Sequence, residues 1–189
     1  MDDRSQSGYT LVELLVTLAV VAILVTTALP ALTDLIDSQR LRATAQQIAA
    51  DLRYARSEAI KRHADIPIGV SFAPGRDWCY GISQQLPCDC RERDWRSPDA
   101  CLLDLAHERQ LHTATHDTRA HVEVLDARFS SDQTTQFDPL RGIARAGTVA
   151  LRSARGKRLD VRISTLGRVR ICAPEDTGDS ASPAGFAPC

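Results

Sequence analysis

Several motifs that mark common enzyme classes are missing from this chain of 189 residues. Serine, histidine and aspartate are plentiful, but there is no nucleophile elbow, no P-loop and no metal-binding motif. The five histidines are scattered over residues 63–121, so we expect them to be surface or loop residues. The sequence therefore predicts a protein that is not an enzyme and that carries no cofactor and no metal.

Charge is absent from one stretch near the N-terminus. The twenty residues from Leu14 to Thr33 carry none, and a helix of that length can cross the roughly 30 Å hydrocarbon core of a bilayer. No cleavage site of the A-x-A kind follows, because Pro30 is succeeded by a charged helical pattern. We therefore expect a membrane anchor. Glu13 lies at its edge, where an ionisable residue without a partner is costly and thus indicates a function.

All the cysteines lie beyond the apolar run. They are Cys79, Cys88, Cys90, Cys101, Cys172 and Cys189. An even number on the exported side of a small domain indicates disulfides. The favoured arrangement pairs Cys172 with Cys189, which closes the C-terminal tail, and pairs the other four within residues 79–101.

Zinc is the alternative reading of the same cysteines. A Cys-x-Cys pair is followed by four histidines, His107, His112, His116 and His121. However, the HTATH stretch lacks the glutamate of a metalloprotease helix, and the spacing matches no closed zinc site. Disulfides are therefore the preferred reading.

Two periodicities divide the rest of the chain. From Leu32 to Ile60, apolar residues recur at spacings of three and four, which predicts that the membrane helix continues as an amphipathic helix. Farther on, apolar and polar residues alternate, which predicts strands. The expected strands are 66–72, 78–83, 102–105, 122–125, 134–137, 148–153, 158–164 and 168–173. The last three are separated by Gly156 and Gly167 and predict an antiparallel meander.

The N-terminal residues carry a resemblance to a known family. The stretch GYTLVE, which begins at Gly8 and precedes the apolar helix, resembles the class III signal of type IV pilins and pseudopilins. The resemblance implies that a prepilin peptidase cuts after Gly8 and methylates the new amine of Tyr9. It also implies that Glu13 pairs with the N-terminal amine of a neighbouring subunit, since a paired charge is tolerable in an apolar filament core. The alternative is a plain membrane anchor with Glu13 at the headgroup interface.

The C-terminal part is similar to the GspH/FimT family of minor subunits. The similarity is carried by an F-x-P-x-G-like turn at residues 137–142, two strands and a closing glycine–arginine motif. In that family, GspH-type members are minor pseudopilins of type II secretion. FimT-type members belong to type IV pili, and some bind DNA for natural transformation through a G-R-x-R motif. Gly167, Arg168 and Arg170 match that motif, which favours the FimT type.

The charge distribution supports this reading independently. Residues 141–170 carry nine arginines and lysines against one acid, Asp160, and such a stripe is the electrostatic footprint of phosphate binding. Arg168 and Arg170 are two apart, so on a strand they would share one face and could contact successive phosphates bidentately. Gly167 would permit a tight turn and a close backbone approach.

Three further basic residues are expected to help the arginine pair. They are Lys157, Arg158 and Arg162. With few aromatic side chains nearby, we expect sequence-independent, salt-sensitive binding of the DNA backbone. The alternative is that the arginines are only the solvated outer face of an amphipathic strand, because Leu159, Val161 and Ile163 alternate with charged residues.

The sequence therefore predicts an α+β protein, in which a long N-terminal transmembrane and assembly helix packs on a C-terminal antiparallel β-sheet domain. The expected segments are a leader at 1–8, the transmembrane helix at 9–33, its amphipathic continuation at 34–63, a β-rich domain at 64–173 and a tail at 174–189. The expected partners are DNA, other major and minor pilins, prepilin peptidase and, before assembly, inner-membrane lipid. The domain would be periplasmic and later exposed on a pilus. The alternative is a GspH-type pseudopilin with a structural role and no DNA binding.

Overall fold

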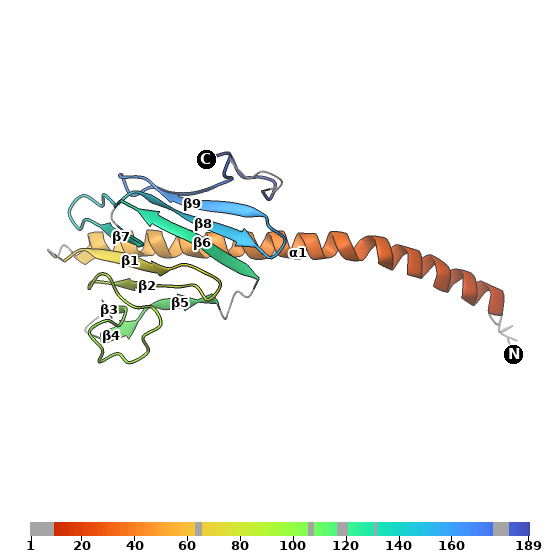
Figure 1. Cartoon of the computed structure of the whole chain (residues 1–189), viewed down its shortest axis with the longest axis horizontal. Coiled ribbons are helices and arrows are strands. Elements are labelled where there is room, and N and C mark those ends of the chain that lie inside the picture. Colours follow the sequence, from red (N-terminus) through yellow and green to blue (C-terminus); the bar gives the residue numbers. More distant parts are fainter. Residues whose placement is uncertain (1–9, 63–65, 106–107, 117–120, 131, 176–181) are drawn as a thin grey trace, which may run out of the picture. The chain divides into compact units, whose positions relative to one another are not determined.

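The computed structural model describes residues 10–62, 66–105, 108–116, 121–130, 132–175 and 182–189 (Figure 1). A long helix, α1 (Leu11–Arg62), is followed within these ranges by ten strands. The chain divides into two compact units, Met1–Ile36 and Asp37–Cys189, and α1 contributes to both. The predicted α+β class, with a long helix packed on antiparallel sheets, is confirmed.

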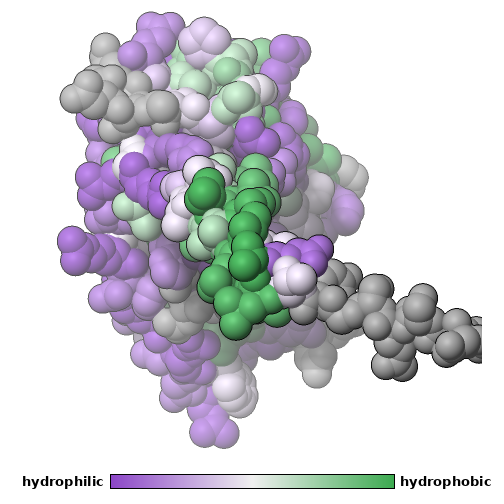
Figure 2. Space-filling model, turned by 90° about the vertical axis from the view of Figure 1, so that its right-hand side faces the viewer, coloured by the Kyte–Doolittle hydropathy of each residue, from purple (hydrophilic) through white to green (hydrophobic). Residues whose placement is uncertain are grey.

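The N-terminal unit consists of an apolar length of α1 with exposed side chains. Figure 2 shows this apolar surface in green. By length and composition, the helix could cross a bilayer. Its threonines are compatible with that setting, because the hydroxyls of Thr17, Thr26 and Thr33 each donate to the carbonyl oxygen three residues earlier, at 2.9 Å. The helix continues through Pro30.

In the C-terminal unit, α1 presents one apolar stripe to the sheets. Its fully buried positions are Leu41, Ala45, Ile48, Ala49, Leu52, Ala55 and Ala59. These spacings of three and four agree with the predicted stripe, and the many alanines let the strands approach the helix axis closely. Two polar contacts hold the helix along the same face: Asp37 accepts a hydrogen bond from the Ser153 hydroxyl, and Asp51 accepts one from the Tyr80 hydroxyl.

The first sheet has the strand order β5–β2–β1–β7, with all neighbours antiparallel. Its strands are β1 (Ile68–Ala73), β2 (Cys79–Ser83), β5 (Thr113–Thr115) and β7 (Thr134–Phe137). β1 and β2 are buried almost throughout. One reason is that they share a core with α1 and the second sheet. Another is that the loop after β2 packs against them, where the Cys88 N–H donates to Ser71 Oγ at 3.1 Å.

The second sheet contains the predicted meander and has the order β10–β9–β8–β6. Its strands are β6 (Val122–Phe129), β8 (Gly147–Ser153), β9 (Arg158–Ile163) and β10 (Val169–Cys172). Side chains alternate across it, so that Leu159, Val161 and Ile163 join the core. The register places Arg170 opposite Arg162 on the other face of the sheet.

The cysteines form three disulfides, Cys79–Cys90, Cys88–Cys101 and Cys172–Cys189. The expectation that the tail is closed by its own bridge and that the other four cysteines pair among themselves is confirmed. The strands β3 (Leu102–Leu105) and β4 (Glu108–Leu111) form a separate hairpin beside the bridged loop.

Three strands differ from the expectation. β4 and β5 were not predicted, because ERQL and TAT have no apolar alternation to mark them. β6 extends to Phe129 rather than stopping at residue 125. It does so across an irregularity in its pairing with β8 between Val124 and Asp126, and such a bulge breaks the period of two on which the prediction depended.

Candidate nucleic-acid interface

The turn between β9 and β10 carries the glycine–arginine motif. Two backbone hydrogen bonds close it: the Gly167 N–H donates to the Ser164 carbonyl at 2.8 Å, and the Ser164 N–H donates to the Arg168 carbonyl at 3.0 Å. Gly167 has φ +70°, a conformation that side chains other than glycine rarely adopt. A Cβ at this position would also overlap the Gly142 carbonyl oxygen. The close approach that this glycine permits is therefore to the chain's own backbone.

Arg168 and Arg170 extend from this turn into solvent. Both side chains are exposed. Neither guanidinium has a hydrogen-bond or ion-pair partner among the residues that the structure describes. Two unneutralised cations are thus held on one short segment whose backbone is fixed by the turn, an arrangement that suits contact with an anionic polymer.

A groove separates this turn from α1. It has a volume of about 690 Å³, and the charged residues that line it are Arg53 and Arg56 from the helix, Arg168 from the turn and Arg170 from the start of β10. Arg53 Nη2 donates to the Val169 carbonyl at 3.1 Å, and Arg56 Nε donates to the Gly142 carbonyl at 3.0 Å. No acidic residue is among the described residues that line the groove.

The sequence reading missed the two helical arginines. It treated them as the polar face of an amphipathic helix, which is the usual role of such residues. The local signal is the spacing of three between Arg53 and Arg56, which places both on one side of α1. That this side faces the glycine–arginine turn is a long-range property, and no pattern within the helix reports it.

The three expected helper residues are placed differently from the pair. Lys157 lies at the other end of β9, a strand of six residues that spans about 20 Å. Its Nζ donates to Ser38 Oγ of α1 at 2.7 Å. Arg158 is half-buried and lies opposite Arg152 on β8. The structure therefore does not bring Lys157 or Arg158 together with the glycine–arginine turn.

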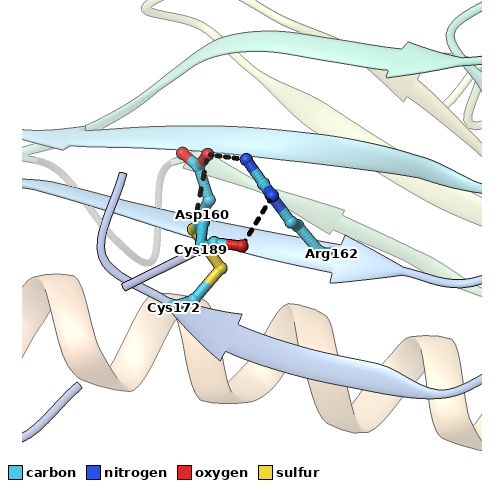
Figure 3. A network of polar contacts seen from close by, with 4 residues as sticks. All are labelled: Asp160, Arg162, Cys172 and Cys189. Carbon is cyan, nitrogen blue, oxygen red and sulfur yellow. Dashed lines mark hydrogen bonds and ion pairs between the residues drawn. A yellow bond between two sulfur atoms is a disulfide. The ribbon is translucent and has the colours of Figure 1, made fainter. Parts of the chain in front are cut away.

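Arg162 is engaged by the tail, as Figure 3 shows. Its Nη1 donates to the Cys189 carbonyl at 3.1 Å, and its Nη2 lies 4.0 Å from Asp160 Oδ2. The Cys172–Cys189 bridge fixes the tail in this place. Asp160 is only 6% exposed. Burial raises the pKa of its carboxyl, although the guanidinium groups of Arg158, Arg162 and Arg128 oppose that rise.

The N-terminal candidates are only partly described. Gly8 and Tyr9 lie outside the described residues. The backbone N–H of Glu13 donates to Thr10 Oγ1 at 3.3 Å, just before α1 begins. Thr10 thus caps the helix with Glu13 at its third position, where a carboxylate also interacts favourably with the helix dipole. No group of three or more metal-ligating side chains occurs in the described ranges.

Comparison with profiles of known protein families shows to which family the chain belongs. The profile of the family described as "Type II transport protein GspH" matches residues 44–167, which is more than half of the chain. The chain belongs to the GspH family. A second profile, "Prokaryotic N-terminal methylation motif", matches residues 3–29. This GspH-family chain therefore carries a prokaryotic N-terminal methylation motif before its family domain. Its family match ends at Gly167, so the two arginines that follow lie beyond it.

Individual proteins also resemble the chain. Type II secretion system protein H of Xanthomonas campestris pv. campestris is 33% identical over 95 residues, which are 50% of this chain and 46% of that protein. The chain thus spans about half the length of this curated relative. Two crystal forms of the type IV minor pilin FimU of Pseudomonas aeruginosa are 16% identical, with TM-scores of 0.46 and 0.43. The first alignment covers 78% of this chain and 95% of the solved chain, and the second covers 77% and 98%.

Proposed function

We propose that this protein is a minor pilin that binds extracellular DNA without sequence preference and aids DNA uptake in natural transformation. The observation that carries the proposal is the state of Arg168 and Arg170. Both are exposed, and neither is neutralised by another residue that the structure describes. In contrast, Lys157 and Arg162 have partners inside the chain. We expect these residues and Arg158 to add to the long-range positive field rather than to contact phosphate.

The pair suits phosphate for two physical reasons. A guanidinium is permanently charged and presents a planar fork of donors that matches the oxygens of a phosphodiester. The turn that carries Arg168 and Arg170 is fixed by backbone hydrogen bonds and by the packing of Gly167 on Gly142, so little backbone entropy is lost on binding. Because phosphates are the same in every sequence, the binding should be non-specific and strongly dependent on salt.

The N-terminal segment would be processed, inserted in the membrane and then assembled into a filament. Prepilin peptidase would cut between Gly8 and Tyr9 and methylate the new amine. The apolar helix would rest in inner-membrane lipid with the domain on the periplasmic side, and then pack against other pilins in a filament at the cell surface. Glu13 would pair with the amine of a neighbouring subunit, since an unpaired carboxylate in an apolar filament core is costly.

A second candidate function is a minor pseudopilin of type II secretion with an assembly role. The observation that favours it is the similarity to type II secretion system protein H over half of the chain. The two candidates differ in one respect that can be measured. A pseudopilin needs no affinity for DNA and has no dependence on the two arginines.

The test is DNA binding by the full chain in a non-ionic detergent, followed by fluorescence anisotropy of a labelled duplex of arbitrary sequence. Non-specific binding has a Kd of roughly 10⁻⁴ to 10⁻⁶ M at physiological salt. The Arg168→Ala/Arg170→Ala variant should bind about 100-fold more weakly at 50 mM salt, since each lost phosphate contact removes about tenfold. The matched control is Arg93→Ala/Arg109→Ala, which removes the same charge from exposed positions that do not line the groove. Equal losses in both variants would refute the proposal, and so would no binding by the unchanged protein.

A further inference from the structure

We propose that Arg53 and Arg56 of α1 are DNA-binding residues, and that the phosphodiester backbone is held in the groove between this helix and the β9–β10 turn. The inference rests on the proposed function and assigns a second wall to the same site. The glycine–arginine motif supplies one side of the groove, and the helix supplies the other.

The contacts of the helical arginines orient them without using up their donors. Arg53 donates one N–H to the Val169 carbonyl, and Arg56 donates one to the Gly142 carbonyl. A guanidinium has five N–H donors, so each side chain keeps several for a ligand. Val169 lines the groove, and the Gly142 carbonyl lies against Gly167 of the turn. The same hydrogen bonds therefore hold both cations at the groove before any ligand arrives. Such preorganisation lowers the entropy lost on binding.

The balance of charge separates this groove from the rest of the second sheet. On its outer face, two of the arginines are matched with acids: Arg152 Nη2 lies 2.7 Å from Glu123 Oε2, and Arg128 pairs with Asp126. In the groove there are four arginines and, among the described lining residues, no acid. Four like charges around one groove repel one another, and a polyanion that enters it relieves that repulsion.

The shape of the site favours a strand over a small anion. A free phosphate is best held in a small nest of converging donors, whereas this groove has a volume of about 690 Å³ and brings its arginines from two separate elements. Leu166, which is 59% exposed, lies on the wall formed by the turn. It offers apolar contact to the sugars that lie between phosphates. These features fit the backbone of a nucleic acid strand.

The experiment uses the full chain in non-ionic detergent and varies Arg53 alone. Arg53→Gln removes the charge but keeps an N–H donor for the Val169 carbonyl, and Arg53→Lys keeps the charge. The control is Arg40→Gln, which removes the same charge from an exposed position that is not on the groove. DNA binding is followed across a salt series, with thermal unfolding of each variant measured beside it. Inorganic phosphate is added as a competitor in a separate arm.

We expect Arg53→Gln to weaken DNA binding about tenfold at 50 mM salt and to lower the slope of log K against log salt by about 0.9. Arg53→Lys should keep most of that slope, and Arg40→Gln should match the unchanged protein. Millimolar phosphate should compete no better than sulfate at the same ionic strength. Preferential competition by phosphate would assign the groove to a small anion and overturn the inference.

The results separate the two proposals. If Arg168→Ala/Arg170→Ala loses DNA while Arg53→Gln binds like the unchanged protein, the helical wall is refuted and the proposed function stands. If Arg53→Gln and Arg40→Gln weaken binding equally, only net charge matters, and the inference is also refuted. If the unchanged protein does not bind DNA, the proposed function itself has failed.

Discussion

Replacing Gly167 with alanine tests how the arginine pair is positioned. At φ +70°, a residue with a Cβ is strained by about 1–3 kcal/mol. The new Cβ would also overlap the Gly142 carbonyl oxygen and approach Arg56 Nε to 2.7 Å, and overpacking of this kind costs about 1–3 kcal/mol. Alanine regains about 0.4–1 kcal/mol by restricting the unfolded chain. We therefore expect the free energy of unfolding to fall by about 3 kcal/mol.

The assay is thermal unfolding followed by circular dichroism. For a protein of this size, a loss of about 3 kcal/mol lowers the Tm by roughly 6–12 °C. Gly185→Ala is a matched control, because Gly185 has φ +93° and no atom within 4 Å of an added Cβ. It should lose only about 1 kcal/mol, or roughly 2–4 °C. If Gly167→Ala is no more destabilising than Gly185→Ala, the packing of the turn on Gly142 contributes nothing and the reasoning is wrong.

Two further predictions concern the domain. Burial raises the pKa of Asp160 above its ordinary value of 3.8. The carboxylate therefore destabilises the fold at pH values above 3.8, where it ionises more readily in the unfolded chain than in the folded one. Asp160→Asn should therefore raise the Tm at pH 7, and the gain should shrink as the pH falls towards 3.8; a gain that is constant with pH would contradict this cause. Leu52 is fully buried, so Leu52→Ala should lower the free energy of unfolding by about 2–5 kcal/mol. Calorimetry should detect that loss, whereas exposed Leu35→Ala should leave the unfolding of the domain unchanged.

The parts of the fold that the sequence predicted are those with a repeating pattern. The buried stripe from Leu41 to Ala59 follows the helical period, and the meander β8–β9–β10 follows the period of two with glycine-containing turns between the strands. The short strands β4 and β5 were not found, since they owe their form to pairing partners rather than to their own side chains. Periodicity reports which face of an element is buried, but it cannot report a neighbour far along the chain.

In the candidate site, too, the sequence predicted what a local motif marks and missed what depends on distant parts of the chain. Arg168 and Arg170 were found because they lie two residues apart in one short sequence motif. The groove that they share with Arg53 depends on how α1 lies against the β9–β10 turn and the start of β10, which no local pattern encodes. The engagement of Arg162 likewise depends on the tail, which the Cys172–Cys189 bridge brings across β9.

The salt dependence of DNA binding tests the central claim most directly. The full chain is titrated with a labelled duplex between 50 and 200 mM salt. Four phosphate contacts predict a slope of log K against log salt of about −3.6, so the affinity should fall about 150-fold over this range. The Arg168→Ala/Arg170→Ala variant should show a slope of about −1.8 and a fall of only about 12-fold. Equal slopes for the two proteins would show that the arginine pair makes no phosphate contact, and the account of this surface as a DNA-binding site would be wrong.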